Sequence, residues 1–251
     1  LESLIIDKPI SLQADGEVIL NVAGNTVGIT ILENVSDVMV DGFTIIGDAL
    51  TGSGITINPG AQNIFITNNI IQDILLPGGG NASPLSYGIL CWGNPDSGLN
   101  PPTNINITGN NISNVLGSGI SLGSNTESVT ISNNTISDIT AVDVQGQDFA
   151  AGIQAELSND LQIDNNTYTN LIQGNSLVDC TNTTLFSNNY DPSSMMMMTN
   201  FPHTVVFNDI PWWSSTASFD MINLEIYFND PNHPYYLLLT SLGFEQNQSS
   251  N

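Results

Sequence analysis

The side chains that could do chemistry in this chain are overwhelmingly acidic. Its 251 residues include 24 aspartates and glutamates, two histidines, a single lysine and no arginine, for a formal net charge of −23. Two nearby carboxyl groups can serve as the acid and base of a glycoside hydrolase. A repeating chain could pair Asp138 with Asp164, or Asp143 with Asp148. No histidine precedes His203, so the usual partner of clustered catalytic aspartates is missing from most of the sequence.

The same composition excludes several kinds of partner. Binding to nucleic acid or to an anionic membrane surface requires basic side chains, and the chain offers Lys8 alone. No apolar run is long enough for a transmembrane helix, so we expect no membrane insertion. Only 10% of the residues are charged and 33 are asparagine, which predicts a largely uncharged polar surface. We expect an extracellular or cell-surface protein, exported by a signal sequence that is not present in this chain.

Asparagine recurs at a fixed offset from isoleucine and valine. Strings that alternate apolar and polar residues, such as "VTISNNTIS" from Val129, occur in five clear copies and one weaker one. Their starts are 23 to 41 residues apart, and Gly-Ile strings such as "GITI" and "GISL" lie between them. Alternation with a period of two indicates strands, and repeats of this length indicate a solenoid. The sequence therefore predicts an all-β parallel β-helix of about six to seven coils over residues 1–190.

The asparagine column has a physical explanation in such a fold. A coil must bend between two sheets, and asparagine tolerates the left-handed backbone conformation that tight bends need. Stacked asparagines can also hydrogen-bond to one another through their side-chain amides. We predict an asparagine ladder, in which Phe43 occupies the first coil's position and the following residues form the rungs: Asn69, Asn110, Asn134, Asn166 and Asn189.

The repeat resembles the right-handed parallel β-helix superfamily, the pectate-lyase-like fold. The strings "ESLIIDKPISL" and "NVSDVMVDGFTI" are similar to the start of NosD-like surface and periplasmic proteins. Lyases of this superfamily abstract a proton with an arginine or lysine, which this chain cannot supply, so the resemblance implies the fold and no lyase activity. It also suggests copper, for which Met195 to Met198, Cys180 and His203 would be the soft donors. We favour a core or interface role for these methionines. We predict no catalytic residue, no metal and no cofactor, with structural calcium bridging outward aspartates as the alternative.

Sequons and cysteines give further expectations. Eight asparagines begin an N-x-S/T sequon, and those expected to face outward are the candidates for N-glycosylation: Asn34, Asn81, Asn106 and Asn182. Cys91 and Cys180 are predicted to lie about three coils apart, too far for a disulfide. We expect both thiols to be free and buried.

The last quarter of the chain differs from the repeat. From Tyr190 onward it holds 11 of the 18 aromatic residues, which predicts a non-repetitive β-rich cap or assembly region over residues 191–251. The predicted assembly interface consists of Met195, Met196, Met197, Met198, Trp212, Trp213, Tyr235 and Tyr236. We predict a non-catalytic structural protein that assembles with itself into a surface layer, sheath or filament, or that forms an adhesin stalk. The alternative is a carbohydrate-binding or carbohydrate-active protein, using an acidic groove or a ledge of Tyr87, Trp92 and Asp96.

Overall fold

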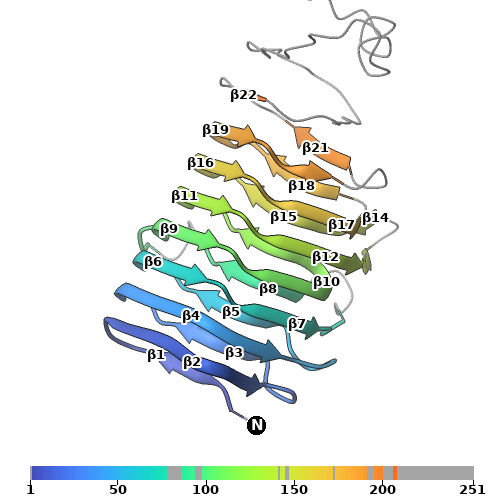
Figure 1. Cartoon of the computed structure of the whole chain (residues 1–251). Coiled ribbons are helices and arrows are strands. Elements are labelled where there is room, and N and C mark those ends of the chain that lie inside the picture. Colours follow the sequence, from blue (N-terminus) through green and yellow to red (C-terminus); the bar gives the residue numbers. More distant parts are fainter. Residues whose placement is uncertain are drawn as a thin grey trace, which may run out of the picture.

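The chain winds into a stack of parallel β-coils, as Figure 1 shows. This computed structural model describes residues 2–77, 86–93, 98–140, 142–144, 147–171, 173–190, 195–199 and 206–207, with side chains for all of them except residues 142–144, 147–149, 190, 195–199 and 206–207. Each strand inside the stack pairs in parallel with its counterparts one coil before and one coil after. The predicted all-β parallel β-helix is confirmed. The described residues include no helix that could cross a membrane.

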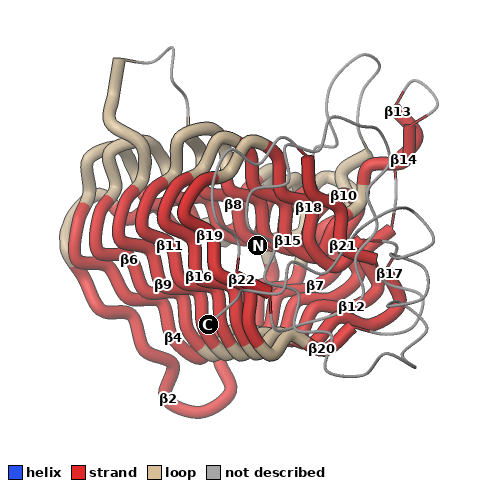
Figure 2. The backbone as a smooth tube through the Cα atoms, turned by 90° about the horizontal axis from the view of Figure 1, so that it is seen from above, coloured by secondary structure: helices blue, strands red, loops and turns tan. Residues whose placement is uncertain are grey.

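Three parallel sheets form the walls of the coil, seen end-on in Figure 2. The first sheet contains β1 (Leu4–Ile6), β3 (Val27–Ile31), β5 (Ser53–Ile57), β8 (Ser86–Cys91), the second half of β10 (Asn111–Leu122), β15 (Ala151–Glu156), β18 (Gln173–Val178) and β21 (Met195–Thr199). The second contains the first halves of β2 (Ile10–Asn21) and β4 (Ser36–Ile46), then β6 (Gln62–Thr67), β9 (Thr103–Thr108), β11 (Glu127–Ser132), β16 (Asn159–Asp164), β19 (Thr181–Phe186) and β22 (Val206–Phe207). The third contains the second halves of β2 and β4, then β7 (Ile70–Ile74), the first half of β10, β12 (Thr135–Thr140), β17 (Thr167–Leu171) and β20 (Asn189–Tyr190). A short antiparallel hairpin, β13 (Val142–Val144) and β14 (Gln147–Phe149), follows β12.

Apolar side chains at alternate positions fill the interior. Val129 and Ile131 of β11 are buried, and they pair in register with buried isoleucines and leucines of the coils on either side. Glycine lines the facing position of the first sheet, because a Cβ on Gly119 would lie 2.7 Å from Cγ2 of Ile136 and 2.7 Å from the carbonyl oxygen of Gly152. The Gly-Ile strings thus make room for the branched side chains opposite.

The bend between the second and third sheets carries the asparagine ladder. Oδ1 of Asn134 accepts hydrogen bonds from the backbone N (2.9 Å) and Nδ2 (3.0 Å) of Asn110, one coil earlier. Nδ2 of Asn134 donates to the carbonyl oxygen of Ile107 and to Oδ1 of Asn166. The same bonds join Asn69 to Asn110 and Asn134 to Asn166. Each rung therefore uses both its amide hydrogens and its oxygen to hold three coils together.

Two details of the predicted ladder are wrong. The rung after Asn166 is Asn188, whose Oδ1 accepts from both nitrogens of Asn166 at 3.0 Å. Asn189 instead opens β20, where it pairs with Thr167. The left-handed conformation also belongs to the residue before each rung, as at Asn133 with φ 56°. The backbone turns at that residue, and this turn points the next side chain inward to the ladder.

The coils continue past the boundary that the sequence analysis placed at residue 190. Strand β21 pairs in parallel with β18, with a register shift between Gln173 and Asn175, and β22 pairs in parallel with β19. Met195 to Met198 therefore lie on a strand of the first sheet, whereas the remaining predicted interface residues, from Trp212 onward, lie outside the described residues.

Replacing a ladder asparagine should lower the free energy of unfolding far more than replacing the residue directly before it. Asn134→Ala leaves the buried N–H of Asn110 without its acceptor, and we expect a loss of about 3 kcal/mol in the free energy of unfolding. Asn133→Gly should stay within about 1 kcal/mol, because glycine accepts the positive φ and Gly109 already fills the same position one coil earlier. Urea denaturation followed by circular dichroism measures both. Equal effects of the two variants would contradict the ladder's role.

Candidate functional site

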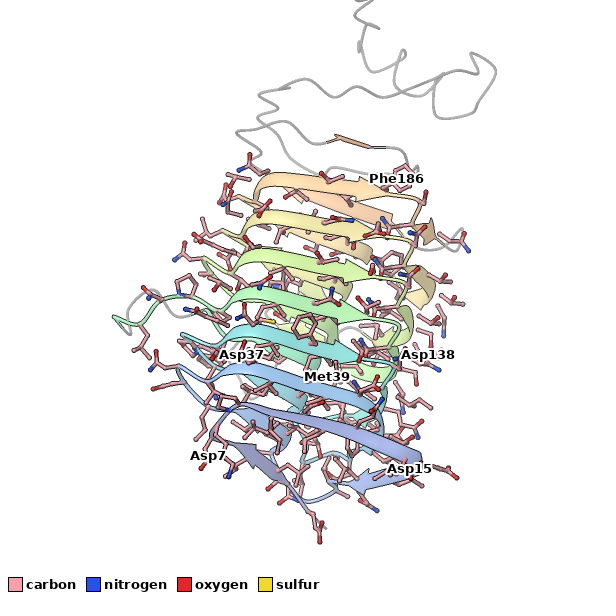
Figure 3. The ribbon with its side chains drawn as sticks, turned by 60° about the vertical axis from the view of Figure 1, so that its left-hand side comes forward. Asp7, Asp15, Asp37, Met39, Asp138 and Phe186 are labelled. Atoms are coloured by element: carbon pink, nitrogen blue, oxygen red, sulfur yellow. The ribbon has the colours of Figure 1, made fainter. Side chains whose placement is uncertain are left out.

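The outer face of the second sheet is a flat array of side chains in register. Its central column runs through Met39, Phe65, Asn106 and Thr130, which occupy equivalent outward positions on β4, β6, β9 and β11. Phe65 is 40% exposed and Met39 is half-buried. Figure 3 turns this face forward and labels Met39. We call it the second-sheet face.

Polar columns border this central column on both sides. On one side Nδ2 of Asn63 donates to Oδ1 of Asp37 at 3.0 Å, and Nδ2 of Asn104 donates to Oδ1 of Asn63 at 2.5 Å. On the other side Oδ1 of Asp41 accepts from the Thr67 hydroxyl at 2.7 Å and from Nδ2 of Asn68 at 2.8 Å. The aspartates of this face are thus held by neutral donors from the adjacent coil.

The same arrangement recurs on the third sheet. Asp73, Asn114, Asp138 and Asn170 lie one above another, because their flanking residues pair in register. Nδ2 of Asn114 donates to Asp73, and Nδ2 of Asn170 donates to Asp138, each at 2.6 Å. Amides and carboxylates alternate along this column, which separates the negative charges.

Hydrogen bonding keeps several of these carboxyl groups ionised. The pKa of Asp37 is lowered by hydrogen bonds from Asn63 and Ser36. The pKa of Asp41 is lowered by those from Thr67, Asn68 and Gln13, and the pKa of Asp48 by backbone N–H groups of Leu50 and Gly24. A general acid at neutral pH needs a raised pKa instead. These three aspartates therefore have the electrostatics of structural acceptors.

The two carboxylate pairs suggested by the sequence have different outcomes. Asp164 on β16 pairs in register with Ser132 and Phe186, and Asp138 lies on a different sheet, so the coils do not stack these two residues. Asp143 and Asp148 are register partners in the backbone of the β13–β14 hairpin.

The aromatic ledge is described in part. Trp92 directly follows β8 and is 49% exposed, while Tyr87 on β8 is half-buried and has a raised pKa because burial disfavours the phenolate. Asp96 lies outside the described residues.

The sequon asparagines lie at three kinds of position. Asn34 is exposed at a turn with φ 60°, and Asn182 is exposed with its Nδ2 donating to Asn159. Asn106 is half-buried on the second-sheet face, and its Oδ1 accepts from the hydroxyl of Thr108. Asn81 lies outside the described residues. Glycosylation of these residues stays a prediction.

Both cysteines are free and buried, as expected. Cys91 continues an inward column of the first sheet, between Ile57 and Leu122. Burial raises the pKa of Cys91 to about 12 and is the main cause that raises the pKa of Cys180 to about 11. Neither thiol is poised for nucleophilic or redox chemistry, which requires the thiolate.

Comparison with known families agrees with this geometry. Residues 11–199 match the family described as "Periplasmic copper-binding protein (NosD)", which is more than half of the chain. The chain belongs to the NosD family. No curated protein matches it in sequence.

Several solved structures are similar to this NosD-family chain at low sequence identity. The surface adhesin PfbA of Streptococcus pneumoniae has a TM-score of 0.54 and 14% identity, covering 80% of this chain and 56% of PfbA. A GH136 lacto-N-biosidase from Eubacterium ramulus has a TM-score of 0.49 and 10% identity, covering 82% of this chain and 50% of the enzyme. The tailspike protein gp49 from Pseudomonas phage LKA1 has a TM-score of 0.42 and 13% identity, over 75% and 32% of the two chains. The chain thus spans between a third and three fifths of the length of these structures.

The described side chains do not fit copper. The soft donors among them are Met39, Cys91 and Cys180, and the two thiols are buried at separate core positions. Within the part of the chain that is described, no three histidine, cysteine, aspartate or glutamate side chains gather into a metal-binding group. The side chains of Met195 to Met198 and of His203 lie outside that part.

Sequence reasoning missed the polar columns of the outer faces, although a signal was present. Asp37, Asn63, Asn104, Ser128, Asp160 and Asn182 all adopt positive φ, and each directly precedes the first inward residue of a second-sheet strand. An alignment of all short polar residues against the isoleucine columns, and not of asparagine alone, would have revealed this second series.

The buried thiols give a direct test of the coil assignment. At pH 8 neither cysteine should react with a thiol-specific disulfide reagent in the folded protein, because both stay protonated and covered, whereas two thiols per chain should react in denaturant. The absorbance of the released thiolate reports the count. Rapid reaction of either thiol without denaturant would place it outside the core.

Proposed function

We propose that this chain is a non-catalytic structural protein outside the cytoplasm, a subunit of a surface layer, sheath or filament, or an adhesin stalk. The observation that carries the proposal is that its carboxylates serve as hydrogen-bond acceptors between adjacent coils. Asp37, Asp41, Asp73 and Asp138 accept hydrogen bonds from amides or hydroxyls of the adjacent coil and so serve as parts of the stacking pattern. A catalytic acid would have a raised pKa and a nearby partner acid.

The placement of the remaining acids supports the same role. Register neighbours of Asp41 are Gln13 and Thr67, and those of Asp164 are Ser132 and Phe186. Charge is therefore dispersed over the coils. The periplasmic description of the NosD family supports a location in the periplasm or at the cell surface.

Self-assembly is supported by the architecture. In a parallel β-helix each coil templates the next through backbone hydrogen bonds, so the strands at an end of the stack can pair with strands of another molecule. Head-to-tail contacts of this kind extend into filaments when they do not close. The tail rich in aromatic residues, with Trp212, Trp213, Tyr235 and Tyr236, would supply the apolar contacts of such an interface.

Electron microscopy of the purified chain tests assembly directly. We expect filaments or sheets, together with a rise in mass with concentration in size-exclusion chromatography with light scattering. A double variant Trp212→Ala, Trp213→Ala should shift the distribution toward monomers, whereas Trp92→Ala, which removes an exposed tryptophan of the coils, should not. Monomers alone at high concentration would refute the assembly.

A carbohydrate-binding role is the second candidate, favoured by one observation. Trp92 presents 49% of its surface at the end of β8, and an exposed indole is a stacking surface for sugar rings.

A glycan array separates this role from the structural one. Binding to neutral glycans that falls at least tenfold in Trp92→Ala, with an unchanged thermal melt, would establish the ledge. Trp92→Phe, which keeps an aromatic face, should retain most of the binding. Binding that survives Trp92→Ala would place any sugar site elsewhere.

A further inference from the structure

The second-sheet face has an apolar centre that the coils leave uncovered. Met39 and Phe65 are register partners on β4 and β6, both outward, and Phe65 is 40% exposed. The same column turns polar in later coils, at Asn106 and Thr130. The polar residues show that the fold does not require Met39 or Phe65 at these positions. We call these two residues the Met39–Phe65 step.

Carboxylates flank this step along the same strand. Asp37 and Asp41 lie two residues before and two residues after Met39 on β4, and Asp37 is exposed (Figure 3). Asn63 and Ser36 hold Asp37, while Thr67, Asn68 and Gln13 hold Asp41. Such bonds fix the direction of a carboxylate but leave its charge in place.

Among the described residues no cation pairs with these charges. The chain's one lysine is Lys8 and it has no arginine, and the two aspartates accept hydrogen bonds from neutral groups. The hydrogen bonds also lower the pKa of both aspartates, which keeps them ionised when the surroundings become mildly acidic. The face is therefore a fixed, uncompensated negative frame around an apolar centre.

We propose that this face docks an extended basic polypeptide segment of the pattern Arg-x-Leu-x-Arg, with Lys accepted for Arg. Side chains on one side of an extended peptide repeat every two residues, about 6.5 to 7 Å apart. Met39 and Asp41 on β4 follow this repeat, and Asp37, whose φ is 58°, lies at the bend directly before the first inward residue of the strand. Two arginines would then pair with the two carboxylates while the leucine contacts Met39.

The chemistry of each contact favours a peptide over a cationic sugar. Guanidinium groups pair with carboxylates through two parallel hydrogen bonds, and they also stack on aromatic rings such as that of Phe65. Methionine adapts its shape to aliphatic side chains. An amino sugar can stack a ring face on Phe65, but its ammonium group is a point charge and makes no bidentate pair with a carboxylate. Docking of the peptide needs the face of a single molecule, so it does not depend on self-assembly.

Fluorescence anisotropy with a labelled nine-residue peptide tests the proposal. The peptide carries arginine at its third and seventh positions, leucine at its fifth, and serine, threonine or glycine elsewhere. Citrulline replaces arginine in the control peptide, which removes the charge and keeps the shape. We expect saturable binding of the arginine peptide at about 50 mM salt, weakened by added salt, and at least tenfold weaker binding of the citrulline peptide.

Matched variants locate the site. Phe65→Thr, and separately Asp37→Asn with Asp41→Asn, should each weaken binding at least tenfold. Ile70→Thr removes an equally exposed apolar side chain on the third sheet, and Asp73→Asn with Asp138→Asn removes the same charge from the third sheet. These controls should change the affinity less than about twofold. Thermal melts of all variants check the fold, and Met39→Thr provides a second probe of the apolar centre.

Three results would overturn the proposal. Equal weakening by the control charge pair would show attraction to the whole acidic chain and not to this face. Tighter binding of a glucosamine polymer than of the arginine peptide, lost in the same variants, would assign the face to an amino sugar. Absence of any saturable peptide binding at millimolar concentration would leave the face without this partner, while the assembly test by electron microscopy would still stand on its own.

Discussion

Hydrogen bonding between successive coils is the interaction on which this structure depends. Because every strand pairs with its own counterpart above and below, each position along a coil must suit the residue one coil away. Asparagine meets this condition at the bend, since its amide both donates and accepts. Oδ1 of Asn134 satisfies two donors of Asn110, and Nδ2 of Asn134 reaches the coils on both sides. The bend is thereby buried, hydrogen-bonded and repeated from coil to coil.

The same condition governs the outside of the coil. A column of stacked aspartates would place like charges about 4.8 Å apart, which is unfavourable. The described coils avoid this arrangement by alternating acids with amides, as in the column of Asp73, Asn114, Asp138 and Asn170. A formal charge of −23 is tolerated with almost no base because the acids are spread among the columns and bonded by neutral donors.

The structural use of these acidic side chains limits the functions that they can serve. Acids that serve as acceptors for the next coil are not free to form a catalytic pair, and buried thiols of high pKa are poor copper ligands. The chain thus shares the scaffold of the NosD family. The described side chains, however, form no group of ligands for the copper that the family's description names. What remains for recognition among the described residues is the surface, with the Met39–Phe65 step and the exposed Trp92.

The sequence by itself determined the fold class, because stacked coils require similar residues at equivalent positions of every repeat. The alternation of isoleucine with polar residues shows this requirement without coordinates. It also placed four of the ladder asparagines and both cysteines in their coils. Only the tertiary structure decided between Asn188 and Asn189, because that choice depends on which residue takes the positive φ at the bend. It alone revealed the bonds that hold Asp37 and Asp41 beside Met39, since residues about 26 positions apart in sequence become neighbours only when the coils stack in register.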